Sequence, residues 1–489
     1  VTYMALSSHE CLITNTGTSE AETSNLIESD YFTFKFKTVV CANVPSTEHY
    51  GKIGFWGSFS IAVNSLTGPA MLTLPATFQR CGLIPTVSTI IFVCFLSSSC
   101  SLFMADVISK IPGNDKFEKE VEFSDSFEYF WGRKWFIFTE VVFFICITCL
   151  NISSIVDTSQ VVDIIFGHWI PGGSAAVQIS FLNGFELIRW DADTCTEEEL
   201  LLGGCTGFSS DTDDGVILTL GYFVTALIFF PMSLLDLQEN SNFQILGFVV
   251  LLVTVIQFAI QFAYSGLYMI NISLWGESWD TLFGVVLFNF ALVIAVPSWL
   301  YERHPLVSIP TVVHGSSILS AFLYIIIGIS GALSIENVSD NMLESMLSGV
   351  FGISMQLGAS FFAFMIIGLG IPLFSVLARL NLTSNEKCSI FVGNILAVIF
   401  PWSVSWILYR GSAVTTLLAW GGTLFTSIVA FVLPLSLALF TVIKVDKVGS
   451  VFGKWIKSQQ LQAFILLFLL LSAVLSIAIA LFGLLLNET

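Results

Sequence analysis

Eleven long apolar runs constrain the fold of this chain more than any other feature of its sequence. A helix needs about 20 apolar residues to cross the hydrocarbon core of a bilayer. Only 11% of the residues are charged, whereas a soluble domain carries roughly a quarter. The sequence therefore excludes a soluble enzyme and predicts an all-α polytopic membrane protein. Its predicted spans cover approximately residues 54–78, 83–109, 134–166, 215–236, 243–268, 281–301, 312–334, 349–379, 389–409, 412–442 and 461–486.

Lysine and arginine residues predict how these spans are oriented, because loops on the cytoplasmic side carry an excess of them. With a cytoplasmic N-terminus, 15 of the 18 basic residues fall on the cytoplasmic side. We therefore expect a cytoplasmic N-terminus and an outer or lumenal C-terminus, in the plasma membrane or a vacuolar or lysosomal-type membrane. Residues 1–50 are polar and predict a disordered cytoplasmic tail, whereas residues 51–489 form the membrane domain.

An acidic loop at about residues 167–214 falls on the outer side and contains no lysine. Cys195 and Cys205 share this loop, so they could form a disulfide on an oxidising side of the membrane. Asn271 and Asn337 begin sequons in outer loops and are candidate glycosylation sites. The cysteines show no metal-ligand spacing, so we expect no metal site.

The first apolar run contains the sequence NSLTGPAMLTLP, in which Gly68 and Pro69 interrupt the helical pattern. Proline has no backbone N–H and clashes with the carbonyl one turn earlier. Freed backbone groups persist in a membrane only where protein covers them or where they line a wet cavity. We interpret the interruption as a discontinuous helix that forms a binding site; the alternative is a proline kink that serves packing alone.

The sixth run, FNFALVIAVPSWLYERHP, is also interrupted, with Pro297 and Ser298 in its inner part. Transporters built from inverted repeats carry broken helices at matching places in their two halves. Interruptions in the first and sixth runs therefore predict a 5+5 inverted repeat with an eleventh transmembrane helix.

Four segments resemble the amino acid/auxin permease family in the order in which that family carries them. They are GFWGSFSIAVNSLTGPAMLTLPATFQRCGLIP at 54–85, FSDSFEYFWGRKW at 123–135, FFPMSLLDLQ at 229–238 and FNFALVIAVPSWLYE at 288–302. The resemblance covers about residues 50–486. It implies the LeuT-like fold of the amino acid–polyamine–cation superfamily and secondary active transport of amino acids.

An amino acid offers a carboxylate and an amine, and a broken helix can bind both. The carboxylate is expected near the amides of residues 66–70, because the N-terminus of a half-helix attracts anions. The amine is expected near Asn64 and the carbonyls of residues 292–295. The predicted substrate-binding residues are Asn64, Ser65, Thr67, Gly68, Pro69, Met71, Asn151, Phe290, Leu292, Val293, Met355 and Gln356.

Carboxylates inside membrane spans are candidates for a functional role, because a charged side chain in lipid is costly. Glu140 and Asp157 lie in the third run and are the candidates for proton coupling, whereas Asp106 and Asp163 are expected to reach water. Sodium-coupled relatives place a hydroxyl residue in the eighth span, but residues 361–372 contain no Ser or Thr. This absence favours a proton as the driving ion; Ser354 and Ser360 would be the ligands of sodium.

The sequence predicts a proton-coupled transporter of neutral amino acids that works by alternating access. A sodium-coupled transporter of the same fold and an amino-acid-sensing receptor remain alternatives. No span carries a wide polar stripe, which argues against a channel, and no nucleophile–base or metal constellation indicates an enzyme. The expected partners are the amino acid and the lipid bilayer, with no cofactor and no nucleic acid.

Overall fold

The computed structural model describes most of the chain from residue 52 to residue 488. Outside the described residues lie 1–51, 181–183, 192–207, 209–215, 280–281, 337, 339–341, 348–350, 385–387, 410–417, 446–450, 452–455, 457 and 489. The predicted disordered tail falls among these, as do Cys195, Cys205 and Asn337. Their predicted disorder, disulfide and glycosylation stay predictions.

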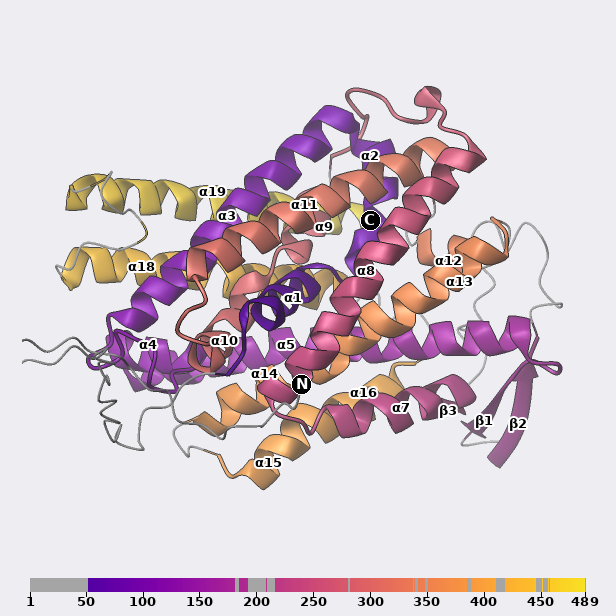
Figure 1. Cartoon of the computed structure of the whole chain (residues 1–489), viewed down its shortest axis with the longest axis horizontal. Coiled ribbons are helices and arrows are strands. Elements are labelled where there is room, and N and C mark those ends of the chain that lie inside the picture. Colours follow the sequence, from indigo (N-terminus) through magenta and orange to yellow (C-terminus); the bar gives the residue numbers. More distant parts are fainter. Residues whose placement is uncertain are drawn as a thin grey trace, which may run out of the picture. The chain divides into compact units, whose positions relative to one another are not determined.

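Every predicted apolar run contains helix (Figure 1). By length and hydropathy, nine helices within the described residues could each cross a membrane. The other two predicted spans are the interrupted first run and α7, which has only 13 residues. The α-helices are α1 (Phe55–Leu66), α2 (Leu74–Cys81), α3 (Leu83–Ser109), α4 (Phe123–Trp131), α5 (Arg133–Trp169), α7 (Leu220–Met232), α8 (Leu237–Ser265), α9 (Leu282–Asn289), α10 (Val296–Glu302), α11 (Ile309–Ser334), α12 (Met342–Leu347), α13 (Ile353–Phe362), α14 (Gly368–Thr383), α15 (Ile390–Asn394), α16 (Phe400–Ile407), α18 (Leu433–Lys444) and α19 (Gln459–Glu488).

Several spans contain short segments that are not α-helical. Two 3₁₀ segments, η1 (Pro69–Thr73) and η4 (Leu292–Ala295), lie inside the first and sixth runs. Wider π-helical turns occur at η5 (Ala363–Ile367), η7 (Ile395–Ile399), η8 (Leu418–Thr426) and η9 (Ile428–Val432). Such turns often lie at functional sites, and one of them, η5, borders the cavity described below.

Two long helices organise the packing. α5 packs against α4, α7, α14 and α16, whereas α11 packs against α1, α2, α3 and α8. In Figure 1, α3, α11 and α8 run obliquely across the view and α5 crosses it horizontally below α1. We call the end of the bundle at which α3 ends and α5 begins the α4 end, because α4 lies between them.

Small residues allow some helices to approach closely, as is common in membrane proteins. A Cβ added to Gly221 of α7 would lie 2.4 Å from the carbonyl oxygen of Ser159 in α5. A Cβ added to Gly328 of α11 would lie 2.3 Å from the ring of Phe78 in α2. These contacts fix α7 on α5 and hold the second half of the broken first helix against α11.

The acidic loop after α5 contains a small antiparallel sheet, which departs from the all-helical expectation. Its strands β1 (Ser174–Ser180), β2 (Gly184–Trp190) and β3 (Val216–Thr219) lie in the order β2-β1-β3. Asp163 of α5 anchors the sheet, because its Oδ1 accepts hydrogen bonds from the Ser174 hydroxyl at 2.5 Å and the Gly221 amide at 2.8 Å. The acidic residues of this loop indicated exposure, so its short strands were not expected.

Candidate functional site

The first run is interrupted at Thr67 and Gly68, as the sequence predicts. α1 ends at Leu66, Gly68 is extended with φ −112° and ψ −160°, and 3₁₀ turns begin at Pro69. The Thr67 hydroxyl and amide both donate to the Val63 carbonyl, at 2.9 and 2.8 Å, and so close the end of α1. A Cβ added to Gly68 would meet no atom within 4 Å. The negative φ and the open space show that this position faces a cavity rather than a tight turn.

The sixth run is interrupted too, but upstream of Pro297. α9 ends at Asn289, and Phe290 and Ala291 separate it from the 3₁₀ segment η4. Pro297 instead lies in the first turn of α10, where a proline is tolerated because that N–H has no helical partner. The non-helical residues, rather than the proline, therefore mark the break.

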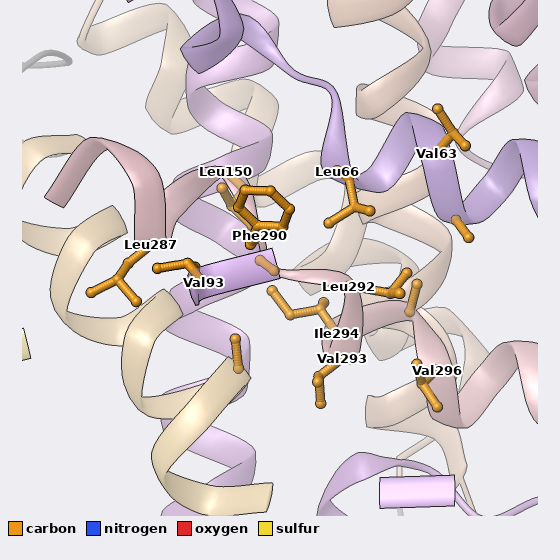
Figure 2. Close-up of a cluster of buried hydrophobic side chains, with 14 of the residues drawn as sticks. Val63, Leu66, Val93, Leu150, Leu287, Phe290, Leu292, Val293, Ile294 and Val296 are labelled. Carbon is orange, nitrogen blue, oxygen red and sulfur yellow. The ribbon is translucent and has the colours of Figure 1, made fainter. Parts of the chain in front are cut away.

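The two breaks face one buried cavity of about 50 Å³. A water molecule needs roughly 10–15 Å³ of such space, so the cavity has room for a few waters. Figure 2 shows Leu66 and residues from Phe290 to Val296 within one cluster of buried apolar side chains. The cavity is lined by Asn64, Ser65, Leu66, Gly68, Leu150, Ser153, Ser154, Phe288, Asn289, Ala291, Ile294, Ala295, Ile366, Ile367, Gly370, Phe374 and Leu377.

Asn64 connects the cavity to two further helices. Its Nδ2 donates to the carbonyl and to the Oε1 of Gln244 in α8, both at 2.8 Å. Gln244 Nε2 in turn donates to the Leu369 carbonyl of α14 at 3.1 Å. Asn64 Oδ1 is buried and has no hydrogen-bond partner among the described residues. An unpaired acceptor at a cavity wall is suited to a ligand's ammonium group.

Tyr324 of α11 lies behind both breaks. Its hydroxyl donates to the carbonyl of Leu66, the last residue of α1, and lies 3.1 Å from the carbonyl of Asn289, the last residue of α9. The side chain is fully buried, and its ring meets Phe290 edge-on at 5.3 Å. One phenol hydroxyl is therefore within hydrogen-bond distance of the last carbonyls of both α1 and α9.

Three of the predicted binding residues, Asn64, Ser65 and Gly68, line the cavity. Four others make contacts elsewhere: Thr67 caps α1, Asn151 Nδ2 donates to Ser375 Oγ at 2.9 Å, Gln356 Nε2 donates to the Leu347 carbonyl at 2.8 Å, and Phe290 packs on Tyr324. Met71, Leu292, Val293 and Met355 are buried in the apolar core. Pro69 begins η1.

The residues that α5 and α14 contribute to the cavity were not among those predicted from the sequence. Ser153 and Ser154 of α5 lie within one helical turn of Asn151, so a polar pair in an apolar run was a usable signal. Phe374 and Ile366 offered no such signal, because aromatic and branched side chains are common throughout the spans.

The two candidate proton-coupling carboxylates lie in different surroundings. Asp157 Oδ2 accepts a hydrogen bond from the hydroxyl of the cavity residue Ser153 at 2.9 Å. Glu140 Oε2 accepts one from Asn381 Nδ2 of α14 at 2.8 Å, near the α4 end. The two residues are about 25 Å apart along α5, at 1.5 Å per residue. Only Asp157 is therefore linked to the cavity through a single side chain.

The other polar residues considered for ion coupling are engaged in local contacts. Asp106 forms a buried ion pair with Lys110 at 2.8 Å, and Asp163 anchors the small sheet. Ser354 Oγ accepts from Gln257 Nε2 at 3.2 Å, and Ser360 Oγ donates to the Gln356 carbonyl at 2.7 Å. Neither serine lines the cavity. Asn271 Nδ2, which would carry a glycan, donates to the carbonyls of Leu333 and Ile335.

Two interrupted helices that face one cavity inside a helical membrane bundle define a protein of the LeuT-like fold. A solved structure of this kind, MhsT in complex with L-phenylalanine, matches with a TM-score of 0.62 and 11% sequence identity, over 89% of this chain and 99% of that one. Residues 51–174 match the family described as transmembrane amino acid transporter protein. No curated protein matches the sequence significantly.

These findings confirm the resemblance to amino acid transporters and the LeuT-like fold. The family that matches residues 51–174 is described as one of amino acid transporters, and the structural likeness shows the fold. The 5+5 repeat, the orientation and the individual binding residues stay predictions.

Proposed function

We propose that this chain is a secondary active transporter that moves neutral amino acids by alternating access. The observation that carries this proposal is the chemistry of the cavity between the two breaks. None of the described residues that line it is charged, and its polar groups come from Asn, Ser and backbone. Such a wall suits a ligand without net charge, because a charged substrate side chain would be left unpaired.

Each part of the substrate has a partner of suitable chemistry in this site. The Asn64 Oδ1 atom is a free acceptor for the ammonium group. The half-helix that begins at Pro69 presents its positive end toward the carboxylate. Leu150, Phe288 and Phe374 surround the remaining space and would contact a neutral side chain.

Proton coupling is the finer part of the proposal. The support is the short link from the cavity through Ser153 to Asp157. A second support is the side-chain amide of Gln244, whose Oε1 accepts from Asn64 of the first helix and whose Nε2 donates to the Leu369 carbonyl of α14. A cation is not needed to join these two elements where one amide already bonds to both.

Uptake into proteoliposomes tests the proposal. The purified full chain would be given labelled neutral, acidic and basic amino acids at two pH values, with and without sodium. We expect accumulation of neutral amino acids driven by an imposed pH gradient. Equilibrium binding without flux would instead favour the amino-acid-sensing receptor, and accumulation only with sodium would overturn the proton reading.

A further inference from the structure

Buried carboxylates gather at the α4 end, away from the cavity. Glu122 and Asp125 begin α4 and are 2% and 7% exposed. Each side chain accepts a hydrogen bond from the other's backbone N–H, in a reciprocal capping box. The Ser384 hydroxyl donates to Asp125 Oδ2. The two carboxylates are therefore ordered parts of the fold and not mobile surface groups.

Glu122 also joins α4 to the broken sixth helix. Ser298 of α10 donates its hydroxyl proton to Glu122 Oε2 at 2.6 Å, and Ser298 is 3% exposed. α10 follows directly after η4, whose Ile294 and Ala295 line the cavity. Only the first turn of the short helix α10 therefore separates the Glu122 contact from the cavity in which the substrate is proposed to bind.

The far end of α10 is bonded to the start of the first helix. The Ile53 amide donates to the Glu302 carbonyl, and the His304 amide donates to the Ile53 carbonyl, both at 2.9 Å. α10 is therefore joined to α4 through Ser298, and its far end is joined to the chain from which α1 begins.

α4 itself is fixed to the long helices on its other side. Asn381 of α14 donates from Nδ2 to Glu140 Oε2 of α5 at 2.8 Å and to Ser124 Oγ at 3.1 Å. The Ser124 amide donates back to Asn381 Oδ1 at 3.2 Å. Glu122 lies at the boundary between this fixed group and α10.

The surroundings of Glu122 disfavour its charged form. Glu122 lies in the segment between the spans α3 and α5, and burial raises the pKa of its carboxyl to about 8. The hydrogen bond from Ser298 opposes this rise, whereas the negative charges of Asp125, Glu120 and Glu140 add to it.

Two arginines of neighbouring elements bind backbone carbonyls of other segments. Arg379 of α14 donates to the carbonyls of residues 233–235, and the Arg303 guanidinium after α10 lies over the Phe117 ring and donates to the Val307 carbonyl. α10 also carries Tyr301 and Glu302, and α3 carries the ion pair of Asp106 with Lys110.

We propose that Glu122 binds a proton while α10 is docked on α4, and releases it to water when α10 moves away. This inference rests on the proposed transport function, in which α10 moves during alternating access. The proton comes from the solution at the α4 end and returns to it, so no other reactant is needed. In the expected orientation that solution is the cytoplasm. Acidity there would favour the docked and closed state, by at most about tenfold per pH unit for one proton.

Infrared difference spectroscopy of the purified full chain tests proton binding without any need for transport. A carbonyl stretch of a protonated carboxyl should titrate with a midpoint near pH 8 and disappear in Glu122→Gln. It should persist in Glu128→Gln, a control on the same helix whose side chain is 32% exposed and paired with Arg133 at 3.1 Å. A band that persists in Glu122→Gln overturns the assignment.

Transport then tests the coupling to α10. In proteoliposomes, substrate release at the α4 end should slow several-fold as the pH on that side falls from about 9 to about 6. Glu122→Gln, which stays neutral, should lose this dependence and keep its substrate affinity, whereas Glu128→Gln should behave as wild type. An unchanged pH profile in Glu122→Gln overturns the coupling. Absence of any amino acid flux in wild type would count against the proposed function, while the infrared titration would still decide the proton site.

Discussion

Tyr324 donates its phenolic proton to the backbone carbonyl of Leu66 at the end of α1. The same oxygen lies 3.1 Å from the carbonyl of Asn289 at the end of α9. One hydroxyl has one proton, so the two carbonyls compete for a single donor. α11 thus supplies a shared partner for both broken helices, and any movement of one break alters the hydrogen bonding of the other.

Replacing Tyr324 with Phe should destabilise the protein and weaken substrate binding. The change leaves two buried carbonyls without this donor, which costs about 1–3 kcal/mol. Thermal unfolding in detergent, with and without amino acid, would measure both effects. Tyr264→Phe is the matched control, because Tyr264 is 84% exposed. Equal unfolding temperatures for Tyr324→Phe and wild type would show that water replaces the phenol without cost.

Asn64→Ala should lower substrate affinity by tenfold or more, since about 1.4 kcal/mol corresponds to a factor of ten. The change removes the unpaired Oδ1 acceptor and the bridge to Gln244 together. Gln244→Ala separates the two, because it removes the bridge and leaves Asn64 in place. Isothermal titration of a neutral amino acid against both variants is the measurement. If Gln244→Ala costs as much as Asn64→Ala, Asn64 acts by positioning α1 and not by accepting the amine.

Gly68→Val should abolish transport while the protein still inserts and folds. An added Cβ at Gly68 meets nothing within 4 Å, so the backbone tolerates it, but the new side chain occupies a cavity of only about 50 Å³. Gly54→Val is a matched control, because a Cβ there also meets nothing and Gly54 lies outside the cavity. Wild-type uptake by Gly68→Val would remove the first break from the substrate path.

Asp157→Asn should spare exchange of substrate but eliminate uptake driven by a pH gradient. The amide mimics the protonated carboxyl and cannot release a proton, whereas its link to Ser153 and the cavity is retained. Glu140→Gln should affect coupling less, because Glu140 lies near the α4 end and not beside the cavity. Counterflow and gradient-driven uptake in the same proteoliposomes separate the two effects. Full pH-driven accumulation by Asp157→Asn, with loss in Glu140→Gln, would reverse this assignment.

The contribution of Glu122 to the stability of the folded protein should fall as the pH rises from about 4.5 to about 8, and should level off above that. The folded state raises the pKa of Glu122 above its ordinary value, so the stabilisation is fully present below that ordinary value and is lost as the carboxyl ionises. Glu122→Gln cannot ionise and should flatten this part of the pH profile. Unfolding temperatures of both proteins from about pH 4 to about pH 9 provide the measurement, and parallel profiles would contradict the role of Glu122.

The positions of the spans could be predicted because length and hydropathy are local properties. α3 occupies the residues that its apolar run predicts. The break at Thr67 and Gly68 was also visible, because Gly and Pro are adjacent there. In the sixth run, residues 292–295 were expected to be interrupted and form η4, whereas Pro297 attracted attention but fits the first turn of α10. Phe290 and Ala291, which follow the end of α9 at Asn289, have no such signature.

The partners of the site residues could not be predicted from local patterns. Tyr324 meets Leu66 across 258 positions of sequence, and Asn64 meets Gln244 across 180. Such pairs depend on how α8 and α11 pack against α1, which hydropathy does not specify. The strands β1, β2 and β3 were missed for another reason, because the acidic residues of their loop indicated exposure and gave no sign of a sheet.

The short parallel bridge between Ile53 and Arg303 has a mechanical consequence. Ile53 lies only two residues before the start of α1, and its two backbone hydrogen bonds grip the end of α10. Tension on the chain at residue 53 would therefore load α1 and α10 at once. A force on the polypeptide that precedes this residue would reach both interrupted helices through one pair of backbone hydrogen bonds.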